Sequence, residues 1–349
     1  MAKLKLAVIF GGQSGEHEVS LRSANQVMNA LNKDKYEIIP IAITKTGQWL
    51  VGEEGKKYLE NNLAKAGQEG GVAVERDGFE ENRRDIFSEK LPAIDLALPI
   101  VHGSYVEDGK LQGMLEMLGI PYVFSGVLAS ALAMNKRKTK IVAKAAGLKI
   151  AKDVVVSKNK KYKTEKIIAK INLPIVVKPL ELGSSVGTSL ANSKEELEKG
   201  IEKALEYGDE VLLEQFIKGR EFTVAIMGTK SPKALPVIEI IPKVSGWFDY
   251  RAKYEAGGSE EVCPAQILDD VRKKIQSYAV KIFKAVGCRD LARADFIWSE
   301  ADSKLYFLEI NTIPGMTATS LAPQAAKTAG MEFPDFLDKL INGARKRIK

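Results

Sequence analysis

Four side chains on two neighbouring predicted strands have the types and spacing of a metal and phosphate site. Arg293 and Asp295 lie two residues apart on a strand predicted over 291–298, so they face the same side of the sheet. Glu309 and Asn311 repeat this spacing in the strand segment 305–311. Oxygen ligands of this kind suit Mg²⁺ or Mn²⁺, and Mg²⁺ commonly adds substrate phosphate to a few carboxylates. A solvated sheet face held by ion pairs explains the same spacing equally well.

A glycine-rich segment over 183–187, with the sequence GSSVG, follows a buried strand that ends in Lys178. Glycines let backbone N–H groups approach an anion closely, and serine hydroxyls add donors. A charge at the end of an apolar strand is costly unless it is paired, and phosphate is one such partner for Lys178. A plain flexible turn is the competing interpretation. The segment also matches the hydrolase elbow G-x-S-x-G, but both histidines precede Ser184 and a strand follows, so we exclude a hydrolase.

Other common sites are missing from the sequence. It contains no P-loop, no G-x-G-x-x-G after the first strand, and no H-E-x-x-H or C-x-x-C metal motif. Glu16 and His17 stand just past Gly11 and Gly12, and His102 directly follows another predicted strand. Ligands of open α/β sheets bind outside the carboxyl ends of strands, so this placement favours a functional role for the histidines over helix capping.

The composition is that of a globular protein with a sizeable core. The 349 residues carry 52 Lys and Arg against 45 Asp and Glu, a net charge of +7, and 45% are hydrophobic. This length predicts two or three domains. No apolar run suits a membrane span, no secretory signal is visible and the two cysteines are isolated, so we expect a cytoplasmic protein. The basic runs lack interleaved aromatics, so they are expected to be solvated surface and do not favour nucleic-acid binding.

Buried strands alternate with helices in the first third of the chain, which predicts a doubly wound parallel sheet. These strands are expected over 4–10, 36–44 and 95–101, with a helix over 20–31, whereas 52–90 carry no firm pattern. Beyond residue 135 the pattern becomes α+β. Helices are expected over 136–146, 164–171, from 193 and over 269–286, and strands over 153–156, 174–178, 188–191, 221–227 and 236–242. Ser193 with Glu196 three residues later is typical of a capped helix start.

Six motifs in order make the chain similar to one family. They are 11–20 (GGQSGEHEVS), 102–113 (HGSYVEDGKLQG), 134–136 (MNK), 177–179 (VKP) with 183–187, 221–224 (EFTV) and 308–317 (LEINTIPGMT). Together they resemble the D-alanine–D-alanine ligases of the ATP-grasp superfamily, over nearly the whole chain. The resemblance implies an α/β ATP-grasp fold, in which an N-terminal domain with a doubly wound parallel sheet (1–125) precedes two α+β subdomains (126–214 and 215–349) that clamp ATP. It also implies a mobile loop over 245–262.

The resemblance implies an ATP-dependent ligase for peptidoglycan precursor synthesis. ATP would phosphorylate the carboxylate of one D-alanine, and the amine of a second would attack the acyl phosphate and expel phosphate. Most of the catalysis would be positioning and charge stabilisation, as is usual in phosphoryl transfer. Two Mg²⁺ or Mn²⁺ ions and a homodimer in the cytoplasm are also implied, with no nucleic-acid or membrane partner.

The resemblance also assigns the nucleotide and metal residues. The lysines Lys136 and Lys178 would bind the phosphates of ATP, and the glutamates Glu214 and Glu221 would hold its adenine and ribose end. Asp295, Glu309 and Asn311 would hold the metal ions. The full set expected to bind ATP is Lys136, Lys178, Gly183, Ser184, Ser185, Glu214, Glu221 and Lys253.

The substrate and catalytic residues come from the same resemblance. Glu16 would pair with the ammonium of the first substrate, and Ser320 would bind the carboxylate of the second. Arg293 would stabilise the tetrahedral oxyanion, and His102 and Gly315 would lie beside the substrates. A hydrogen-bonded trio of Glu16, Ser184 and Tyr254 would latch the mobile loop. The catalytic residues are therefore expected to be Glu16, Ser184, Tyr254, Arg293 and Ser320.

Two alternatives stay open. A ligase that joins D-alanine to D-lactate or D-serine would share the fold, but such variants alter the loop that carries Lys253 and Tyr254. The presence of these two residues favours an amine nucleophile. A non-catalytic protein that binds ATP or an amino acid on the same scaffold is the second alternative. This second alternative is disfavoured because the chain keeps the complete polar set on its two predicted strands, namely Arg293, Asp295, Glu309 and Asn311.

Overall fold

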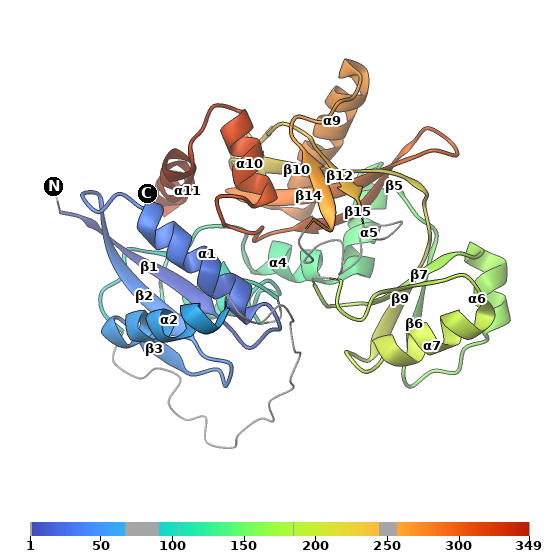
Figure 1. Ribbon diagram of the computed structural model, residues 1–349, viewed down its shortest axis with the longest axis horizontal. Helices are drawn as coiled ribbons and strands as arrows, with labels where there is room; N and C mark the ends of the chain where they lie inside the picture. Colours follow the sequence, from blue (N-terminus) through green and yellow to red (C-terminus); the bar gives the residue numbers. More distant parts are fainter. Residues whose placement is uncertain (1, 67–90, 104, 184, 244–256, 349) are drawn as a thin grey trace.

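The computed structural model describes residues 2–66, 91–103, 105–183, 185–243 and 257–348, which form three sheets with helices packed on them (Figure 1). The first sheet has the strand order β3-β2-β1-β4. Its members are β1 (Leu4–Gly11), β2 (Tyr36–Ile43), β3 (Trp49–Val51) and β4 (Leu96–Val101). The strand β1 runs parallel to both β2 and β4, which confirms the parallel sheet predicted from their apolar runs, and β3 is an antiparallel edge.

The helices of this first part are α1 (His17–Ala30), α2 (Glu53–Ala66) and α3 (Lys110–Met117). The helix α1 begins three residues earlier than predicted and buries Leu21, Ala24 and Val27. The prediction that 52–90 carry no pattern is wrong for α2. This helix is mostly polar, and among its few apolar side chains Leu59 is buried in the core, so its apolar stripe is too narrow to recognise from the sequence.

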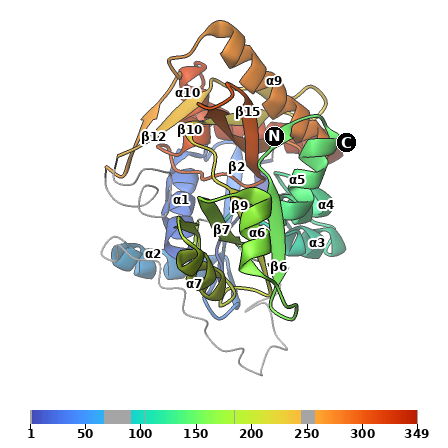
Figure 2. The same cartoon turned by 90° about the vertical axis from the view of Figure 1, so that its right-hand side faces the viewer.

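The middle sheet is antiparallel, with the order β6-β9-β7-β8. Its strands are β6 (Asp153–Ser157), β7 (Ile175–Pro179), β8 (Ser189–Ala191) and β9 (Glu210–Gln215), and α6 (Thr164–Ile171) and α7 (Lys194–Ala204) pack on it (Figures 1 and 2). The predicted cap of α7 is confirmed, because Ser193 Oγ accepts a hydrogen bond from the Glu196 backbone N–H at 3.2 Å. The Glu196 carboxylate, however, accepts from Asn192 N–H and not from Ser193.

The third sheet has seven strands, in the order β13-β12-β10-β14-β15-β5 with β11 beside β10. Its strands are β5 (Lys149–Ile150), β10 (Gly219–Met227), β11 (Lys233–Ala234), β12 (Ile238–Pro242), β13 (Ser259–Val262), β14 (Leu291–Ser299) and β15 (Leu305–Asn311). The helix α9 (Asp269–Val286) has the predicted bounds and buries Ile275, Ala279 and Ile282 at helical spacing. With α4 (Val127–Met134) and α5 (Lys136–Ala145), it covers this sheet.

One part of the loop predicted over 245–262 is a strand. Ser259–Val262 forms β13, which pairs antiparallel with β12. The prediction of a loop is wrong for these four residues, because their backbone groups complete the edge of the third sheet. Residues 244–256 lie outside the described part of the chain.

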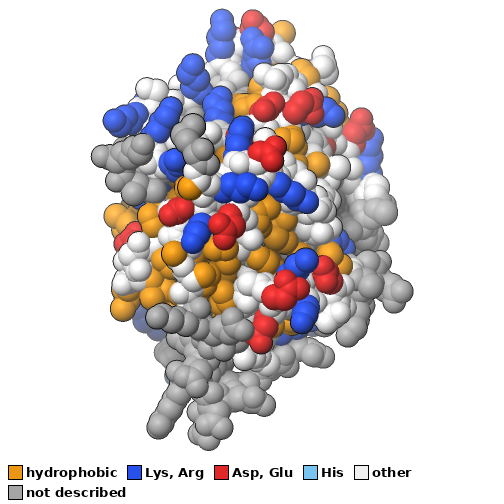
Figure 3. All heavy atoms as spheres, turned by 90° about the vertical axis from the view of Figure 1, so that its left-hand side faces the viewer, with side chains coloured by type: hydrophobic (Ala, Val, Ile, Leu, Met, Phe, Trp, Pro, Cys, Tyr) orange, Lys and Arg blue, Asp and Glu red, His pale blue; other side chains and the backbone are white. Residues whose placement is uncertain are grey.

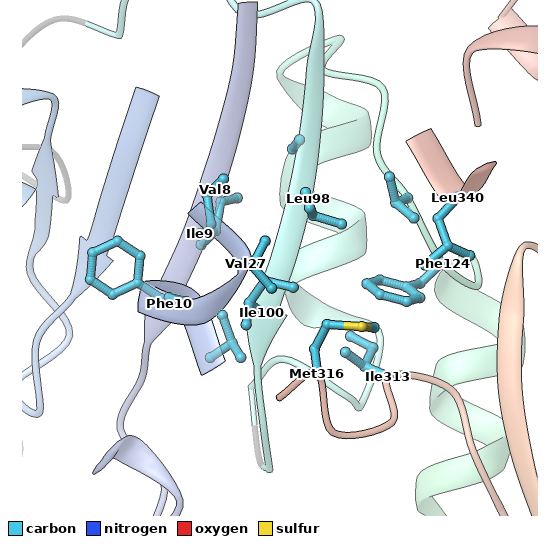
Figure 4. Packing of buried hydrophobic residues seen from close by; sticks show 14 of the residues in the cluster. Val8, Ile9, Phe10, Val27, Leu98, Ile100, Phe124, Ile313, Met316 and Leu340 are labelled. Atoms are coloured by element: carbon cyan, nitrogen blue, oxygen red, sulfur yellow. The ribbon is translucent and has the colours of Figure 1, made fainter. Parts of the chain in front are cut away.

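The end of the chain returns to the first sheet. The helices α10 (Leu321–Thr328) and α11 (Phe333–Ile348) contribute to the same apolar core as β1 and β4. Figure 4 shows Met316 and Ile313 close to Phe124, with Leu340 above them. The Arg347 side chain on α11 forms an ion pair with Asp290 and donates to the Tyr122 carbonyl at 2.8 Å. The C-terminal helix therefore fastens the third sheet to the first.

Charges of both signs share the molecular surface. On the face in Figure 3, basic and acidic side chains lie next to one another around an apolar area. This mixing fits the expectation that the excess of basic residues is solvated. In the described part of the chain, none of the helices combines the length and the apolar character that a bilayer crossing requires.

Candidate active site

Two adjoining cavities lie where the three sheets meet. The first has a volume of about 330 Å³ and the second about 310 Å³. Four residues line both of them, namely Lys136, Leu182, Gly183 and Glu309. The first cavity is also lined from the ends of β1 and β4, from β14 and β15 and from the start of α10. The second is also lined from β7, β9, β10, β12, β14 and β15. A ligand in one cavity can therefore meet a ligand in the other at this shared wall.

The second cavity collects the predicted nucleotide residues. Lys178 and Glu214 enter from the middle sheet, Glu221 enters from the third sheet, and Ser185 follows the shared Gly183. The apolar side chains Val176, Ile297 and Leu308 form part of the same wall. A cavity with both apolar walls and charged groups suits a flat base that carries phosphates. The predicted Ser184 and Lys253 lie outside the described residues.

The structure pairs Lys178 with a side chain that the sequence did not suggest. Its Nζ lies 2.8 Å from Oε2 of Glu214, which is itself only 4% exposed. The other oxygen of Glu214 forms an ion pair with Lys140, a fully buried lysine on α5. Burial lowers the pKa of Lys140, and the charge of Lys178 acts in the same direction. Lys140 was missed because a lysine within the run KRKTK has the sequence pattern of an exposed helix face.

Lys136 stands at the start of α5, at the wall between the cavities. Asn135 caps this helix, since its side-chain oxygen accepts from the Lys138 backbone N–H at 2.9 Å. The amide of Asn135 also donates to Glu181 at 2.5 Å, and the Lys136 ammonium donates to the Leu182 carbonyl. The cap therefore joins the N-terminus of α5 to the segment that leads into the glycine loop.

The predicted cluster on β14 and β15 is confirmed in its geometry. Asp295 pairs with Glu309 and Arg293 with Asn311 in the antiparallel register. Arg293 donates two hydrogen bonds to Asp295, at 3.0 Å from Nε and 2.9 Å from a terminal nitrogen. Burial alone would lower the pKa of Arg293, but the Asp295 carboxylate raises it above its usual value. The guanidinium is therefore permanently charged.

Asp295 and Asn311 are also held by neighbours. The hydroxyl of Thr223 on β10 donates to Asp295 Oδ1 at 2.5 Å. The side-chain oxygen of Asn311 accepts from the Ile313 backbone N–H at 2.9 Å. Since a carboxylate has about four acceptor positions, Asp295 keeps room for one more partner beside Arg293 and Thr223. Thr223 was not singled out from the sequence, although it lies within the motif EFTV.

The first cavity brings together Glu16, His102, Arg293, Gly315 and Ser320. A Cβ built on Gly183 would lie 3.7 Å from Oε2 of Glu16, so this carboxylate lies beside the start of the glycine loop. The third member of the predicted trio, Tyr254, lies outside the described residues, like Ser184.

The buried pair His102 and Glu107 also lines this cavity. Nδ1 of His102 lies 3.9 Å from Glu107, whose other oxygen accepts from the Gly103 backbone N–H at 3.0 Å. Burial would lower the pKa of His102, but the Glu107 and Glu16 carboxylates raise it overall. Burial also raises the pKa of Glu107. The sequence placed Glu107 inside a motif without assigning it a role.

Ser320 stands at the N-terminus of α10 and lines the same cavity. Its Oγ accepts from the Thr317 backbone N–H at 3.1 Å. A Cβ on Gly315 would lie 2.9 Å from this oxygen, so a larger residue there would displace the Ser320 side chain. The first N–H groups of a helix attract an anion, which suits a substrate carboxylate beside Ser320.

His17 lines neither cavity, so the preference for a functional role is not supported for this residue. Its Nδ1–H donates to the Gly12 carbonyl at 2.7 Å, and Nε2 lies 3.2 Å from the Tyr58 hydroxyl. Burial lowers the pKa of His17. These contacts fix the turn between β1 and α1 and thereby position Glu16.

Comparison with known proteins decides the family. The family model described as the N-terminus of D-ala D-ala ligase matches residues 5–125, and the model of its C-terminus matches residues 142–342. The chain belongs to the D-alanine–D-alanine ligase family. It is 40% identical to the D-alanine–D-alanine ligase of Natranaerobius thermophilus, with 98% of this chain and 94% of that protein covered.

Two solved ligases of this family have the same architecture. The VanG D-Ala:D-Ser ligase from Enterococcus faecalis is 36% identical with a TM-score of 0.82, covering 98% of this chain and all (100%) of that chain. The D-alanine–D-alanine ligase from Bacillus anthracis complexed with ATP is 29% identical with a TM-score of 0.75, covering 99% and 100%. The three sheets are therefore those of the ATP-grasp fold, as predicted.

Proposed function

We propose that this protein is an ADP-forming D-alanine–D-alanine ligase that supplies the dipeptide for peptidoglycan synthesis. The observation that carries the proposal is the shared wall of the two cavities, formed by Lys136, Leu182, Gly183 and Glu309. ATP in the second cavity would direct its terminal phosphate to this wall, and D-alanine in the first would direct its carboxylate to the same place. Holding the two reactants in contact provides most of the rate enhancement expected in such a reaction.

The reaction has two steps in this arrangement. A carboxylate oxygen of the first D-alanine attacks the terminal phosphorus of ATP, which releases ADP and leaves an acyl phosphate. The amine of the second D-alanine, after losing a proton, attacks the acyl carbon, and the C–O bond to phosphate then breaks. Arg293 is charged and lines the first cavity, so it would stabilise the tetrahedral oxyanion.

The substrate groups find partners of opposite charge in the first cavity. The ammonium of the first D-alanine would pair with Glu16, and the carboxylate of the second would bind at Ser320 and the start of α10. His102 and Gly315 would lie beside the substrates. The predicted contribution of Ser184 and Tyr254, through the trio with Glu16, remains part of the proposal.

In the second cavity, Lys136 and Lys178 would bind the phosphates, together with Gly183, Ser185 and the predicted Ser184 and Lys253. Glu214 and Glu221 would face the adenine and ribose, because they line the same slot as its apolar wall. Charge-assisted hydrogen bonds from the lysines to phosphate are stronger than neutral ones.

The oxygen-rich set on β14 and β15 suits Mg²⁺ or Mn²⁺. Asp295, Glu309 and Asn311 would hold the ions, and the open acceptor position on Asp295 supports this assignment. Substrate phosphate and water would complete the coordination, as is common for Mg²⁺ held by few carboxylates. Such an ion would neutralise the charge of the transferred phosphoryl group.

Three further expectations belong to the same proposal. They are the division of the chain into 1–125, 126–214 and 215–349, a homodimeric state and a cytoplasmic location.

The competing function is the ligation of D-alanine to D-serine or D-lactate. The likeness to the E. faecalis D-Ala:D-Ser ligase is the observation that favours D-serine as the second substrate. Thr317, Thr319 and Ser320 line the first cavity, and their hydroxyls could bond that of D-serine.

The test is incubation with ATP, Mg²⁺ and D-alanine, alone or with equimolar D-serine or D-lactate, followed by analysis of phosphate and products. We expect ADP, phosphate and D-alanyl-D-alanine in equal amounts, with the dipeptide predominant in both competitions. Predominance of the D-serine or D-lactate product would overturn the choice of second substrate. Absence of ADP from the folded protein would overturn the ligase.

A further inference from the structure

Lys140 is buried and lies outside both cavities. Its side chain is 1% exposed and lines neither of them. Its ammonium forms an ion pair with Oε1 of Glu214. An isolated buried ammonium is costly, so a lysine in this place requires a carboxylate partner. The family roles described above leave this residue without a function.

Glu214 stands between two lysines with different access to ligand. Lys178 contacts Oε2 at 2.8 Å, but its side chain is 19% exposed and lines the second cavity. An incoming phosphate therefore competes with Glu214 for Lys178. Lys140 does not line the cavity, so its ion pair with Glu214 is out of the path of an incoming phosphate.

The strands set the direction of the Glu214 side chain. Glu214 lies on β9 opposite Val176 of β7, and both residues line the second cavity. The carboxylate thus has one face toward the buried lysine and its surroundings, and another toward the apolar slot in which the base would lie. An ionised carboxylate only accepts hydrogen bonds, so it pairs with an amino group and repels a carbonyl oxygen.

We propose that Lys140 is a positioning residue that keeps Glu214 ionised and oriented toward the 6-amino group of adenine, and so makes the site prefer adenine over 6-oxopurine nucleotides. This inference rests on the proposed use of ATP. Selection by pairing is effective because the wrong base leaves a buried polar group unpaired.

The test compares ATP with inosine triphosphate, which carries an oxygen at position 6, in the Lys140→Met variant. Methionine nearly matches the length of lysine and removes its charge. Weakening a hydrogen bond to a charged group is expected to raise KM for ATP, and to lower the ATP-to-inosine triphosphate ratio of kcat/KM, by about tenfold each. KM for D-alanine is expected to stay unchanged.

Two further variants separate positioning from general damage. Lys144→Met changes an exposed lysine on the same helix and is expected to leave both KM and the nucleotide ratio unchanged. Glu214→Gln is expected to lower the nucleotide ratio by itself, and Lys140→Met added to it is expected to lower the ratio no further. The Glu214→Gln measurement also decides the matter if Lys140→Met fails to fold.

The inference would be overturned if Lys140→Met kept the wild-type ATP-to-inosine triphosphate ratio of kcat/KM, even with lower activity on both nucleotides. It would also be overturned if Glu214→Gln kept the wild-type preference for ATP. Wild-type activity with ATP and D-alanine tests the proposed function separately, because it does not depend on the nucleotide ratio.

Discussion

Glu309 is the carboxylate at which the two cavities meet. It lines both of them and lies opposite Asp295 in the sheet. Glu309→Gln keeps the shape of the side chain and removes its charge, so the proposed phosphates and cation would lose one stabilising group. We expect kcat to fall by on the order of 10²–10³, with an unchanged melting temperature. Steady-state rates measured against Mg²⁺ concentration test this expectation.

The matched control is Glu195→Gln, which changes an exposed glutamate on α7 and should leave kcat unchanged. Wild-type rates and wild-type Mg²⁺ dependence in Glu309→Gln would show that the metal assignment is wrong.

His17 gives the stability a predictable dependence on pH. Its pKa is lowered by burial, so between that lowered value and about 6.5 the unfolded chain binds more protons than the folded one. Its contribution to stability is complete above pH 6.5 and is lost as the pH falls through the pKa of the folded state. The free energy of unfolding of wild type minus that of His17→Gln should therefore shrink on acidification, by at most about 1.4 kcal/mol per pH unit.

Denaturant titrations of both proteins between about pH 5 and 8, the range in which histidine titrates, measure this difference. A difference that stays constant, or grows as the pH falls, would contradict the burial of a neutral His17. His102 titrates in both proteins, so its opposite effect cancels in the comparison.

At the scale of elements, the start of α5 connects helix capping to the proposed nucleotide site. Asn135→Ala removes the hydrogen bond to Lys138 N–H and the contact with Glu181. Loss of such a cap is expected to lower the free energy of unfolding by about 0.5–2 kcal/mol. KM for ATP should rise as well, because Lys136 and the segment before the glycine loop lose their common anchor.

Ser193→Ala is the control for this prediction, because Ser193 caps α7 in the same way but lines neither cavity. It should lower the stability by a similar amount and leave KM for ATP unchanged. Equal KM values in the two variants would mean that the Asn135 cap acts on stability alone.

The elements also show where sequence patterns suffice. The bounds of α9 follow from an apolar stripe, and the shared face of Arg293 and Asp295 follows from the alternation of side chains in a strand. The helix α2 could not be predicted, because it buries few side chains. The burial of Lys140 could not be predicted either, because its partner Glu214 is distant in the sequence.

At the scale of the whole molecule, Arg347 joins the last helix to two distant parts of the chain. It pairs with Asp290, whose carboxylate also accepts from the Phe124 backbone N–H at 2.9 Å and from the Thr229 hydroxyl at 3.0 Å. Arg347→Ala leaves a buried carboxylate with its cation removed. We expect the free energy of unfolding to fall by about 3–5 kcal/mol.

Arg345→Ala, an exposed neighbour on α11, serves as the control and should change the stability by less than about 0.5 kcal/mol. Denaturant unfolding of both variants gives the comparison. Equal stability of the two variants would mean that the ion pair contributes nothing to fastening α11.

The central claim is that a D-alanine carboxylate in the first cavity attacks ATP bound in the second. D-alanine labelled with ¹⁸O in its carboxylate tests this claim most directly. Because the attacking oxygen leaves with phosphate when the amine displaces it, each dipeptide should be accompanied by one phosphate that carries one ¹⁸O. Mass spectrometry or ³¹P NMR of the released phosphate detects the label. Dipeptide formed together with unlabelled phosphate would contradict the acyl phosphate, and with it the meeting of the two substrates at the wall that the cavities share.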